Sequence, residues 1–283
     1  MSGLFDLAGR VCVVTGGTKG IGAGTAERML EHGAQVVITS REKEAAEDRA
    51  RHLNDRFGEG RAIGLPLDLA DRETGRVLVE TVAARLGRID SLMCNAALMV
   101  LGRLEDMGDE LEVMDASFQS NVRNYASLTR HVVPIMRAQG GGSIIYILSN
   151  AAFIAAPPFL PYAISKLGLD YMARAFAVEY GKDNIRVNAI APGSIATGRP
   201  SGVELSGAPQ RFIRDIPLPR RGAPDDIAGM AILLSAPAGE YITGQTITVD
   251  GGMTIKGADG VTEGFDMAAA YVAKENAGRP VSD

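Results

Sequence analysis

The chain has 283 residues, 46% of them hydrophobic, and a formal net charge of −5. This length suits one large α/β domain, and an acidic chain without a basic, aromatic-rich stretch is not expected to bind nucleic acid. The first residues do not resemble a signal peptide, and no run approaches the ~20 apolar residues of a membrane span. We therefore expect a cytoplasmic protein that does not cross a membrane.

The first predicted strand is the apolar run Arg10–Val14, and a glycine-rich turn and a helical pattern follow it. Gly16, Gly20 and Gly22 form the spacing G-x-x-x-G-x-G, and the helical pattern ends at Gly33. Glycines let a backbone approach a pyrophosphate, and the free N–H groups of a helix N-terminus attract phosphate. A plain tight turn is the alternative, but the flanking strand and helix favour a dinucleotide-binding loop.

Strands alternate with helical patterns along the rest of the chain, which predicts an α/β fold, a parallel sheet with helices on both faces. Ligands of such sheets bind at the carboxyl ends of the strands. Asp68, Asn95, Ser149 and the pair Pro192-Gly193 all stand at or just past such ends. The later predicted strands cover Gln35–Thr39, Ala62–Asp68, Asp90–Asn95, Ser143–Leu148, Arg186–Ala191 and Thr246–Asp250.

The cysteines and histidines of the chain show no pattern of a metal site or a disulfide. Cys12 and Cys94 fall inside predicted strands, so we expect buried free thiols. His32, His52 and His131 are scattered without metal-ligand spacing, and no metal site is predicted.

The residues at the end of the second predicted strand indicate whether the protein binds NADP(H) or NAD(H). Ser40 stands where NAD-binding sites carry an acidic residue, and Arg41 follows it. Arg41 can grip a 2′-phosphate bidentately, and Lys19 in the glycine loop can add a second positive charge. These features predict NADP(H) rather than NAD(H). The alternative is that both cations are solvated and that Glu42 is the acid of an NAD site.

The sequence Tyr162-Ala-Ile-Ser-Lys166 places a tyrosine and a lysine on one face of a predicted helix. A tyrosine hydroxyl titrates near pH ~10, but a nearby ammonium favours the phenolate and lowers that pKa. Tyr162 then becomes a usable acid or base, and the Ser149 hydroxyl can hold a substrate oxygen against it. This chemistry suits the interconversion of a carbonyl and an alcohol. A helix start with an inward aromatic residue is the alternative.

An ordered set of motifs identifies a family. The set resembles the compact, single-domain type of the short-chain dehydrogenase/reductase family and spans Leu7 to Met253. Three residues depart from the family pattern, since Cys94 replaces a common asparagine, Ala97 a glycine, and Leu148 a serine that is common just before the catalytic one. The resemblance implies a Rossmann-like, doubly wound sheet of about seven strands. The motifs are Thr15-Gly-x-x-x-Gly-Ile-Gly22, Asn95-Ala-Ala97, Ser149, Tyr162-x-x-x-Lys166 and Pro192-Gly193.

The resemblance also implies roles for individual residues. Tyr162 would be the acid or base, Ser149 would hydrogen-bond the substrate oxygen, and Lys166 would act on Tyr162 and on the nicotinamide ribose. Asn121 would hold a water and shape a helix. The implied cofactor contacts are Gly16, Thr18, Lys19, Gly20, Ile21, Gly22, Ser40, Arg41, Asp68, Leu69, Asn95, Ala97, Tyr162, Lys166, Pro192, Gly193, Ile195 and Thr197.

We expect a dinucleotide-binding and catalytic domain over residues 1–253 and a C-terminal extension over residues 254–283. The Gly-, Pro- and charge-rich stretch Ser194–Arg221 stands where the family has a mobile substrate lid. The extension is expected to pack on a neighbouring subunit or to be a disordered tail, and Phe265–Lys274 could form a helix. The resemblance implies a homodimer or homotetramer that pairs the helices near Ser117–Met136 and Tyr162–Tyr180.

The substrate is expected to be an apolar ketone or secondary alcohol, because the windows around the site are mostly apolar. They include Leu98, Met99, Val100, Phe153, Ile154, Pro158, Phe159 and Leu160. A 3-oxoacyl-carrier-protein reductase is an alternative and would use a basic patch from Arg199, Arg211, Arg214, Arg220 and Arg221. The same motifs would also fit an NAD-dependent alcohol dehydrogenase or a non-catalytic dinucleotide sensor.

Overall fold

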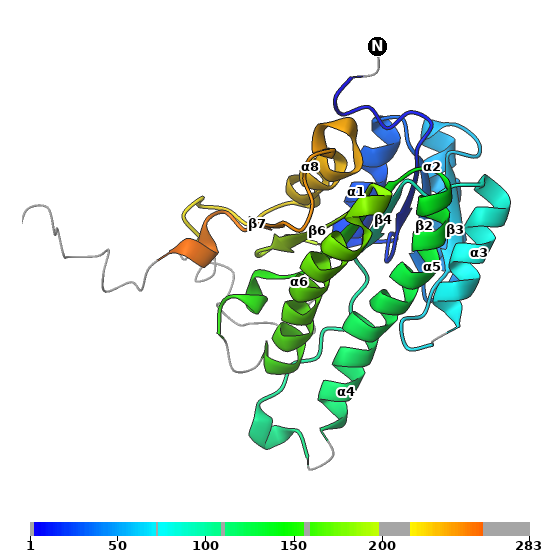
Figure 1. Ribbon diagram of the computed structural model, residues 1–283. Coiled ribbons are helices and arrows are strands. Elements are labelled where there is room, and N and C mark those ends of the chain that lie inside the picture. The colour runs from blue at the N-terminus through cyan, green and yellow to red at the C-terminus, as the bar shows by residue number, and fades with distance from the viewer. Residues whose placement is uncertain (1–2, 72, 109–110, 156–158, 198–215, 257–283) are drawn as a thin grey trace, which may run out of the picture.

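The computed structural model describes residues 3–71, 73–108, 111–155, 159–197 and 216–256. These residues contain a parallel sheet of seven strands in the order β3-β2-β1-β4-β5-β6-β7 (Figure 1). All seven predicted strands are confirmed, with ends that differ from the predicted ones by at most two residues. The strands are β1 (Val11–Val14), β2 (Gln35–Ser40), β3 (Ala62–Pro66), β4 (Ser91–Cys94), β5 (Gly142–Ile147), β6 (Ile185–Pro192) and β7 (Thr246–Val249).

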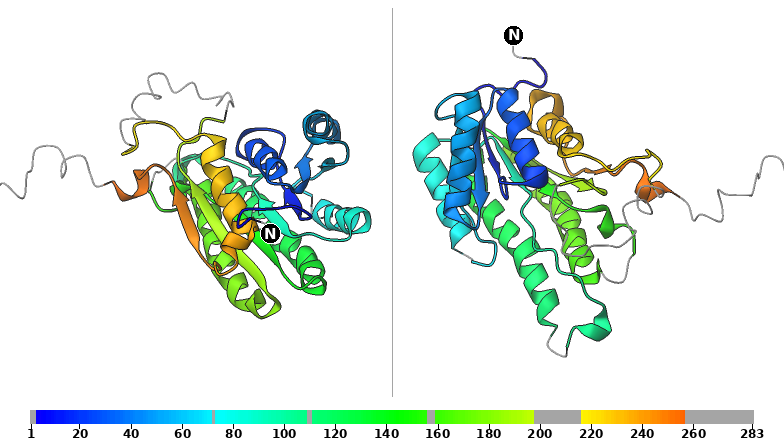
Figure 2. Two further views of the ribbon diagram at one scale, coloured as in Figure 1. Left: turned by 90° about the horizontal axis from the view of Figure 1, so that it is seen from above. Right: turned by 180° about the vertical axis from the view of Figure 1, so that it is seen from behind.

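Two layers of helices cover the sheet, which confirms the predicted doubly wound arrangement (Figure 2). One layer consists of α1 (Gly20–Glu31), α2 (Lys43–Phe57) and α8 (Pro224–Ser235). The other consists of α3 (Thr74–Leu86), α5 (Asn124–Ala138) and α6 (Leu160–Tyr180). A short helix α4 (Glu112–Phe118) and a π-helical segment η2 (Gln119–Arg123) lead into α5.

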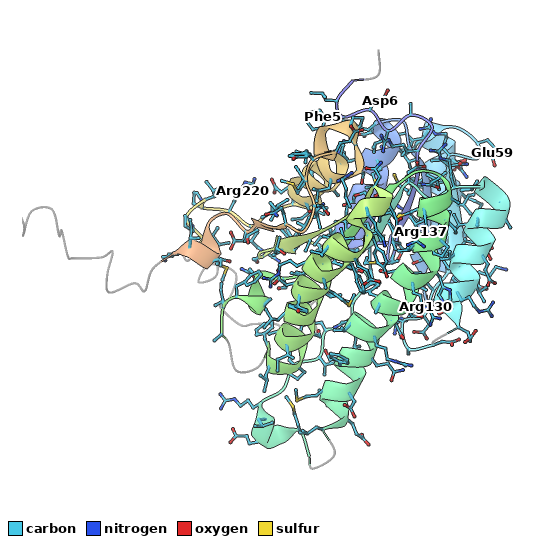
Figure 3. All side chains as sticks on the ribbon, viewed as in Figure 1. Phe5, Asp6, Glu59, Arg130, Arg137 and Arg220 are labelled. Carbon is cyan, nitrogen blue, oxygen red and sulfur yellow. The ribbon has the colours of Figure 1, made fainter. Side chains whose placement is uncertain are left out.

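Apolar residues on both faces of the strands explain why two layers form. In β1, Val11 and Val13 join the core under α3, α5 and α6, whereas Cys12 and Val14 join the core under α1, α2 and α8. Side chains of consecutive strand residues point to opposite faces, so a continuous apolar run must be covered twice. Figure 3 shows side chains filling the space between the sheet and both layers. Cys94 lies on the face opposite to Cys12, and both are buried free thiols, as predicted.

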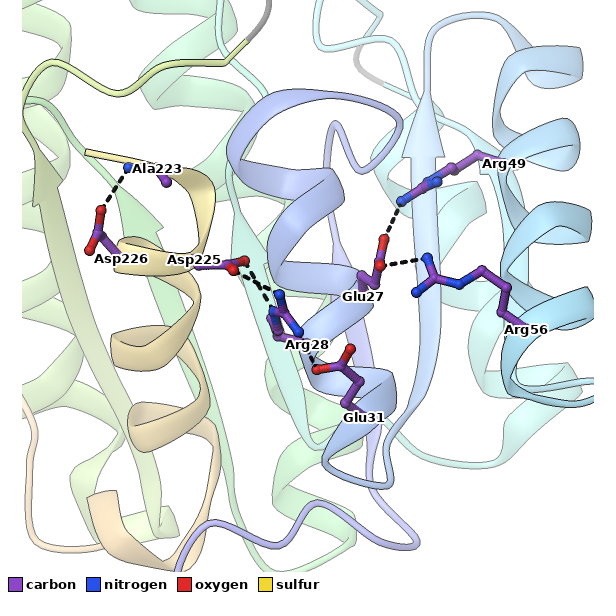
Figure 4. Close-up of polar contacts among 8 residues, drawn as sticks. All are labelled: Glu27, Arg28, Glu31, Arg49, Arg56, Ala223, Asp225 and Asp226. Carbon is purple, nitrogen blue, oxygen red and sulfur yellow. Dashed lines mark hydrogen bonds and ion pairs between the residues drawn. The ribbon is translucent and has the colours of Figure 1, made fainter. Parts of the chain in front are cut away.

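Helix α1 is held from both sides by charged residues (Figure 4). Arg28 forms an ion pair of 2.7 Å with Asp225 of α8, and Glu27 pairs with Arg49 and Arg56 of α2. Such partly exposed pairs contribute little energy individually, but they orient the helices that the apolar core packs together. The glycine loop that precedes α1 is therefore mounted on a fixed element.

The strand order reverses beside β1, which pairs with β2 on one side and with β4 on the other. The chain leaves β1 toward β2 and β3 and then returns to form β4 on the other side of β1. Loops on either side of such a reversal diverge and leave a crevice at the carboxyl ends of the strands. The predicted glycine loop and the Asn95 turn flank this crevice.

The predicted lid and the predicted C-terminal extension lie largely outside the described residues. Of the predicted lid, residues 198–215 lie outside them, and so do residues 257–283 of the C-terminal extension, including the helix expected over Phe265–Lys274. Within the described part of the chain, no helix has the length and apolar character needed to cross a bilayer.

Candidate active site

The loop after β1 has the geometry of a phosphate cradle. Gly16 and Gly20 have φ values of +67° and +59°, which residues other than glycine rarely adopt. A Cβ atom at Gly22 would lie 2.3 Å from the Gly16 carbonyl oxygen, so the first turn of α1 closes directly onto the loop. Lys19 is exposed where α1 begins. A helix N-terminus behind an open glycine loop fits a dinucleotide pyrophosphate.

The remaining loop residues are placed on the two sides of this turn. Thr18 is partly buried within the loop, and Ile21 packs against the core under α1, α2 and α8. Gly20 faces Thr197, since a Cβ atom at Gly20 would lie 3.2 Å from the Thr197 Cβ. The structure thus brings Thr197, predicted as a nicotinamide contact, to the glycine loop.

The turn after β4 is bonded to the glycine loop. Thr15 is completely buried, and its Oγ1 accepts hydrogen bonds from the backbone N–H groups of Asn95 at 2.9 Å and Ala96 at 3.1 Å. The Asn95 side chain donates to the carbonyl oxygens of Thr15 at 2.9 Å and Gly16 at 3.2 Å. Asn95 therefore supports the loop from beneath, and the partly buried Ala97 follows at the crevice.

The end of β2 lies beside the glycine loop. The Gly16 N–H donates to the Thr39 hydroxyl at 3.2 Å, and the Gly17 N–H donates to the Thr39 carbonyl at 3.0 Å. Ser40 is partly buried and accepts a hydrogen bond from the Glu42 N–H at 3.3 Å. Arg41 is exposed directly after the strand.

Asp68 and Leu69 follow β3 at the same edge of the sheet. The Asp68 carboxylate accepts a hydrogen bond from the Ala70 N–H at 2.9 Å, and the Leu67 N–H donates to the Ser40 carbonyl at 2.8 Å. Leu69 packs on the core, and its carbonyl accepts a hydrogen bond from the Asn124 amide. Both residues thus lie just past the carboxyl end of β3, beside the carboxyl end of β2.

Asn121 is buried in the π-helical segment η2 and clamps the backbone of Leu98. Its Oδ1 accepts from the Leu98 N–H, and its Nδ2 donates to the Leu98 carbonyl, both at 2.8 Å. The Nδ2 atom also lies 3.0 Å from the Ser165 hydroxyl, which belongs to α6. A single π-helical turn in a helix is frequent at functional sites. Asn121 joins the turn after β4 to the helix that carries Tyr162.

Lys166 is the most enclosed charged residue of the site. It is 1% exposed, and its Nζ donates a hydrogen bond of 2.7 Å to the carbonyl of Ile147, the last residue of β5. The same atom lies 5.5 Å from the centre of the Tyr162 ring, in the arrangement of a cation–π contact. Burial lowers the pKa of Lys166 to about 7, while the nearby Cys94 thiol acts in the opposite direction.

Ser149 and Tyr162 both precede Lys166 in the chain, and helix α6, which carries Tyr162, contacts the short helix that follows Ser149. Ser149 precedes the short helix η3 (Asn150–Ala152), and its Oγ accepts a hydrogen bond from the Ala151 N–H at 3.2 Å. The hydroxyl proton of Ser149 is not used in that bond. Tyr162 is partly buried in the first turn of α6, which Pro161 favours as a helix start. The two hydroxyl-bearing residues are therefore held at the carboxyl end of β5.

The segment after β6 completes this edge. Pro192 ends the strand, and a Cβ atom at Gly193 would lie 2.5 Å from the Cβ of Asp250, so only glycine fits there. Ile195 is buried and forms an isolated parallel bridge with Gly222. This bridge holds together the two ends of the predicted lid.

Three residues of this network were not predicted as site residues, namely Thr15, Tyr125 and Ser165. Thr15 and Ser165 could have been found from the sequence, because Thr15 begins the glycine motif and Ser165 immediately precedes Lys166. Tyr125 follows Asn121 at i+4 and so shares its helix face. Its hydroxyl bonds the Thr15 hydroxyl at 2.9 Å and the Ala96 carbonyl.

A family model described as "Enoyl-(Acyl carrier protein) reductase" matches residues 16–254. The Caenorhabditis elegans protein "Dehydrogenase/reductase SDR family member 4" is 35% identical over 250 residues, which cover 87% of this chain and 95% of that protein. The "3-oxoacyl-[acyl-carrier-protein] reductase FabG" of Thermotoga maritima is 34% identical over 257 residues, which cover 88% of this chain and 99% of that protein.

Solved structures agree with this match. A gluconate 5-dehydrogenase from Burkholderia cenocepacia J2315 in complex with NADP and tartrate superposes with a TM-score of 0.83 at 30% identity. The alignment covers 90% of this chain and 98% of that structure. The chain therefore belongs to the short-chain dehydrogenase/reductase family and is an oxidoreductase that acts on a CH–OH or C=O group.

Proposed function

We propose that this protein is a carbonyl reductase that interconverts an apolar ketone and a secondary alcohol, with NADP(H) as hydride carrier. The observation that carries the proposal is the enclosed ammonium of Lys166, 5.5 Å from the centre of the Tyr162 ring. A cation in that position stabilises the phenolate that remains when the tyrosine gives up its proton.

The cofactor supplies the hydride, and the protein supplies orientation and protons. In the direction of reduction, Tyr162 donates its hydroxyl proton to the substrate oxygen, and the Ser149 hydroxyl donates a hydrogen bond to the same oxygen. Lys166 stabilises the resulting phenolate. In the direction of oxidation, the Tyr162 phenolate removes the alcohol proton.

Lys166 is also suited to return the proton to Tyr162. Burial lowers its pKa to about 7, so it can lose and regain a proton near neutral pH. For Asn121 we propose a positioning role, because its side chain holds both backbone polar groups of Leu98. That contact fixes the turn that borders the reacting centre.

The preference for NADP(H) over NAD(H) rests on charge at the end of β2. Arg41 and Lys19 are both exposed at the edge of the glycine loop, and Ser40 leaves the usual acidic position neutral. The related gluconate 5-dehydrogenase was solved with NADP, which supports the assignment by analogy. We expect Arg41→Ser to weaken binding of NADPH about tenfold and to leave NADH binding unchanged. Arg51→Ser is the control, because Arg51 is an exposed arginine further along α2.

An apolar substrate is favoured by the surface around the site. Leu98 and Met99, which follow the turn after β4, and Phe153, which follows η3, are all exposed large apolar residues. Exposed apolar side chains that gather beside a polar reacting centre favour an apolar ligand.

A 3-oxoacyl-carrier-protein reductase is the second candidate, because the Thermotoga maritima relative has that name. An acidic carrier protein would need free cations near the site. Of the five arginines predicted for that patch, only Arg220 and Arg221 lie in the described part of the chain. Arg220 pairs with Asp226 at 2.7 Å, and Arg221 bonds Ser194 and the Ile195 carbonyl. These contacts favour the small ketone.

We also propose that the protein is a homodimer or homotetramer that assembles through α6. Its outer face carries the exposed apolar residues Ile164, Leu167, Tyr171 and Val178. Such a continuous apolar face on a helix is typical of a subunit contact.

The test compares initial rates with NADPH and NADH on ketones, keto-esters and an acyl thioester, beside Tyr162→Phe and Tyr241→Phe. Tyr241 is fully exposed and lies outside both the site and the apolar face of α6, so it is the control for loss of a tyrosine hydroxyl. We expect ketone reduction with NADPH, and a fall of at least ~100-fold in kcat/KM for Tyr162→Phe alone. Faster turnover with NADH would support an NAD-dependent alcohol dehydrogenase. Tight NADPH binding without turnover in either direction would support a sensor.

A further inference from the structure

Tyr125 lies on α5, and its hydroxyl bonds two parts of the proposed dinucleotide site. The side chain is completely buried. Its hydroxyl lies 2.9 Å from Thr15 Oγ1, at the start of the glycine loop, and donates to the carbonyl of Ala96, in the turn after β4. A helix of the opposite layer thus reaches both sides of the strand-order reversal.

These contacts close into a ring of hydrogen bonds. Tyr125 has one hydroxyl proton and donates it to the Ala96 carbonyl, so the Thr15 hydroxyl must be the donor in the Thr15–Tyr125 bond. The Met93 carbonyl lies farther from the same threonine oxygen, at 3.3 Å. Thr15 Oγ1 in turn accepts from the Ala96 N–H at 3.1 Å and from the Asn95 N–H at 2.9 Å. A closed ring of buried hydrogen bonds is mutually reinforcing.

The phenol is built to stay a donor. Burial, followed by the neighbouring Cys94 thiol, raises the pKa of Tyr125 well above its usual range, so the hydroxyl keeps its proton at any working pH. The ring therefore has one stable pattern of donors and acceptors.

Tyr125 and Asn121 act on the same turn. They stand at i and i+4 across the junction of η2 and α5, which places both side chains on one helix face. Asn121 holds the backbone of Leu98, and Tyr125 holds that of Ala96. The two side chains thus bond the turn after β4 two residues apart. Of the two, only Tyr125 also bonds the glycine loop, through Thr15.

We propose that Tyr125 is a positioning residue of the dinucleotide site, whose hydroxyl fixes the glycine loop against the turn after β4. This inference rests on the proposed function, because it assumes that a dinucleotide occupies the crevice between them. A loop that is already fixed loses less conformational entropy when the ligand binds, so the affinity is higher.

The variant Tyr125→Phe removes the hydroxyl and leaves the ring of the side chain in place. The Ala96 carbonyl then loses this donor, and the Thr15 hydroxyl keeps only the longer approach to the Met93 carbonyl at 3.3 Å. The loop is then held against the turn only by the bonds of Asn95 and of the Ala96 N–H, and it is less fixed. We expect the dissociation constant for the preferred dinucleotide to rise about tenfold. The KM for the dinucleotide should rise with it, and kcat should change less, because the reacting groups are untouched.

Tyr146→Phe is a closely matched control. Tyr146 is also completely buried, and its ring centre lies 6.3 Å from that of Tyr125 in the same core. Its hydroxyl bonds Thr129 at 2.6 Å rather than any residue of the site. Both variants delete one buried phenol hydroxyl, so a general loss of stability affects them alike.

The experiment measures dinucleotide binding by calorimetry and amide hydrogen exchange in the dinucleotide-free protein. Support would be a weakened affinity in Tyr125→Phe but not in Tyr146→Phe, with exchange at the Asn95 and Ala96 amides at least about tenfold faster only in the former. Tyr125→Phe should then add little to Thr15→Val, because the valine already removes the hydroxyl through which Tyr125 reaches the glycine loop.

Two other results would overturn the inference. Equal affinities in the wild type and Tyr125→Phe would show that the hydroxyl does not position the site. Equal losses in Tyr125→Phe and Tyr146→Phe would reduce its role to core stability. If the wild-type protein bound neither NADPH nor NADH, the proposed function itself would fail, and the inference would fall with it.

Discussion

Lys166 is joined to Ile147 by a hydrogen bond of 2.7 Å that runs from α6 to the last residue of β5. Ser149 follows Ile147 by two positions and Tyr162 precedes Lys166 by one helical turn. One enclosed ammonium therefore joins the strand that leads to the serine to the helix that carries the tyrosine. The same enclosure lowers the pKa of Lys166 to about 7, which has consequences for stability.

We predict that the stability of the wild-type protein rises with pH through Lys166. Below pH 7 both the folded and the unfolded chain hold the lysine proton, and the folded state carries the full cost of a buried charge. Between pH 7 and the ordinary lysine pKa of ~10.4, only the unfolded chain still holds it, so stability increases with pH. In Lys166→Met this rise should be absent.

The check is urea unfolding of wild type and Lys166→Met at pH 6 and pH 9.5, with the exposed Lys182→Met as control. The difference in unfolding free energy between Lys166→Met and wild type should move in favour of wild type at the higher pH, by a few kcal/mol. Lys182→Met should follow the wild type at both pH values. A pH-independent difference for Lys166→Met would show that the lysine is not buried as a cation.

The close approach of Gly22 to the Gly16 carbonyl predicts a second effect. In Gly22→Ala the new Cβ would lie 2.3 Å from that oxygen, and backbone must move. We expect a loss of about 2 kcal/mol of stability and a loss of dinucleotide binding. Gly229→Ala is the control, because a Cβ there meets no atom within 4 Å and Gly229 is exposed within α8. That change should stabilise by about 0.5–1 kcal/mol. If Gly22→Ala bound NADPH as tightly as the wild type, the loop after β1 would not be the phosphate-binding loop.

The strands and the glycine loop could be predicted from the sequence because their signals are local. Apolar runs such as Val11–Val14 need cover on both faces, and a glycine cluster between strand and helix has few other uses. The spacing of Tyr162 and Lys166 predicts that the two side chains lie together, and the Lys166 Nζ is 5.5 Å from the Tyr162 ring centre. Its bond to the Ile147 carbonyl could not be predicted, because a backbone partner leaves no mark in the sequence.

Other features depend on contacts between distant segments. The π-helical turn that holds Asn121 spans five residues, too few for periodicity to distinguish it from α-helix. Tyr125 resembles any core aromatic residue, and its partner Thr15 is 110 positions away. Ser149 was predicted as a strand-end residue, but its cap of η3 depends on the backbone conformation that follows.

The pair of hydrogen bonds between the Asn121 side chain and the Leu98 backbone also occurs elsewhere in the molecule. Asn54 of α2 makes the same pair of bonds to Ala62 of β3, with its Nδ2 donating to the carbonyl at 3.0 Å and its Oδ1 accepting from the N–H at 2.7 Å. We predict that Asn121→Ala and Asn54→Ala each cost about 1–3 kcal/mol of unfolding free energy, because each leaves a backbone pair without its partner.

Only Asn121→Ala should also change catalysis, because Leu98 borders the site and Ala62 does not. We expect kcat/KM for a ketone to fall at least about tenfold in Asn121→Ala and to stay within about twofold of wild type in Asn54→Ala. Steady-state kinetics beside urea unfolding separates the two effects. Parallel losses of stability with unchanged kinetics in both variants would limit Asn121 to a structural role.

The outer face of α6 predicts the assembly. Tyr171 and Val178 are 71% and 86% exposed and lie in line with Ile164 and Leu167, which are also exposed. These residues are spaced so that they share one helix face. Leaving such an apolar face exposed to water would cost free energy. We expect Val178→Lys to shift the mass measured by light scattering toward a smaller species, because a buried unpaired ammonium opposes the contact. Val77→Lys on α3 is the control, since Val77 is 49% exposed on a helix outside this face. A wild-type monomer, or a Val178→Lys variant of unchanged mass, would place the contact elsewhere or remove it.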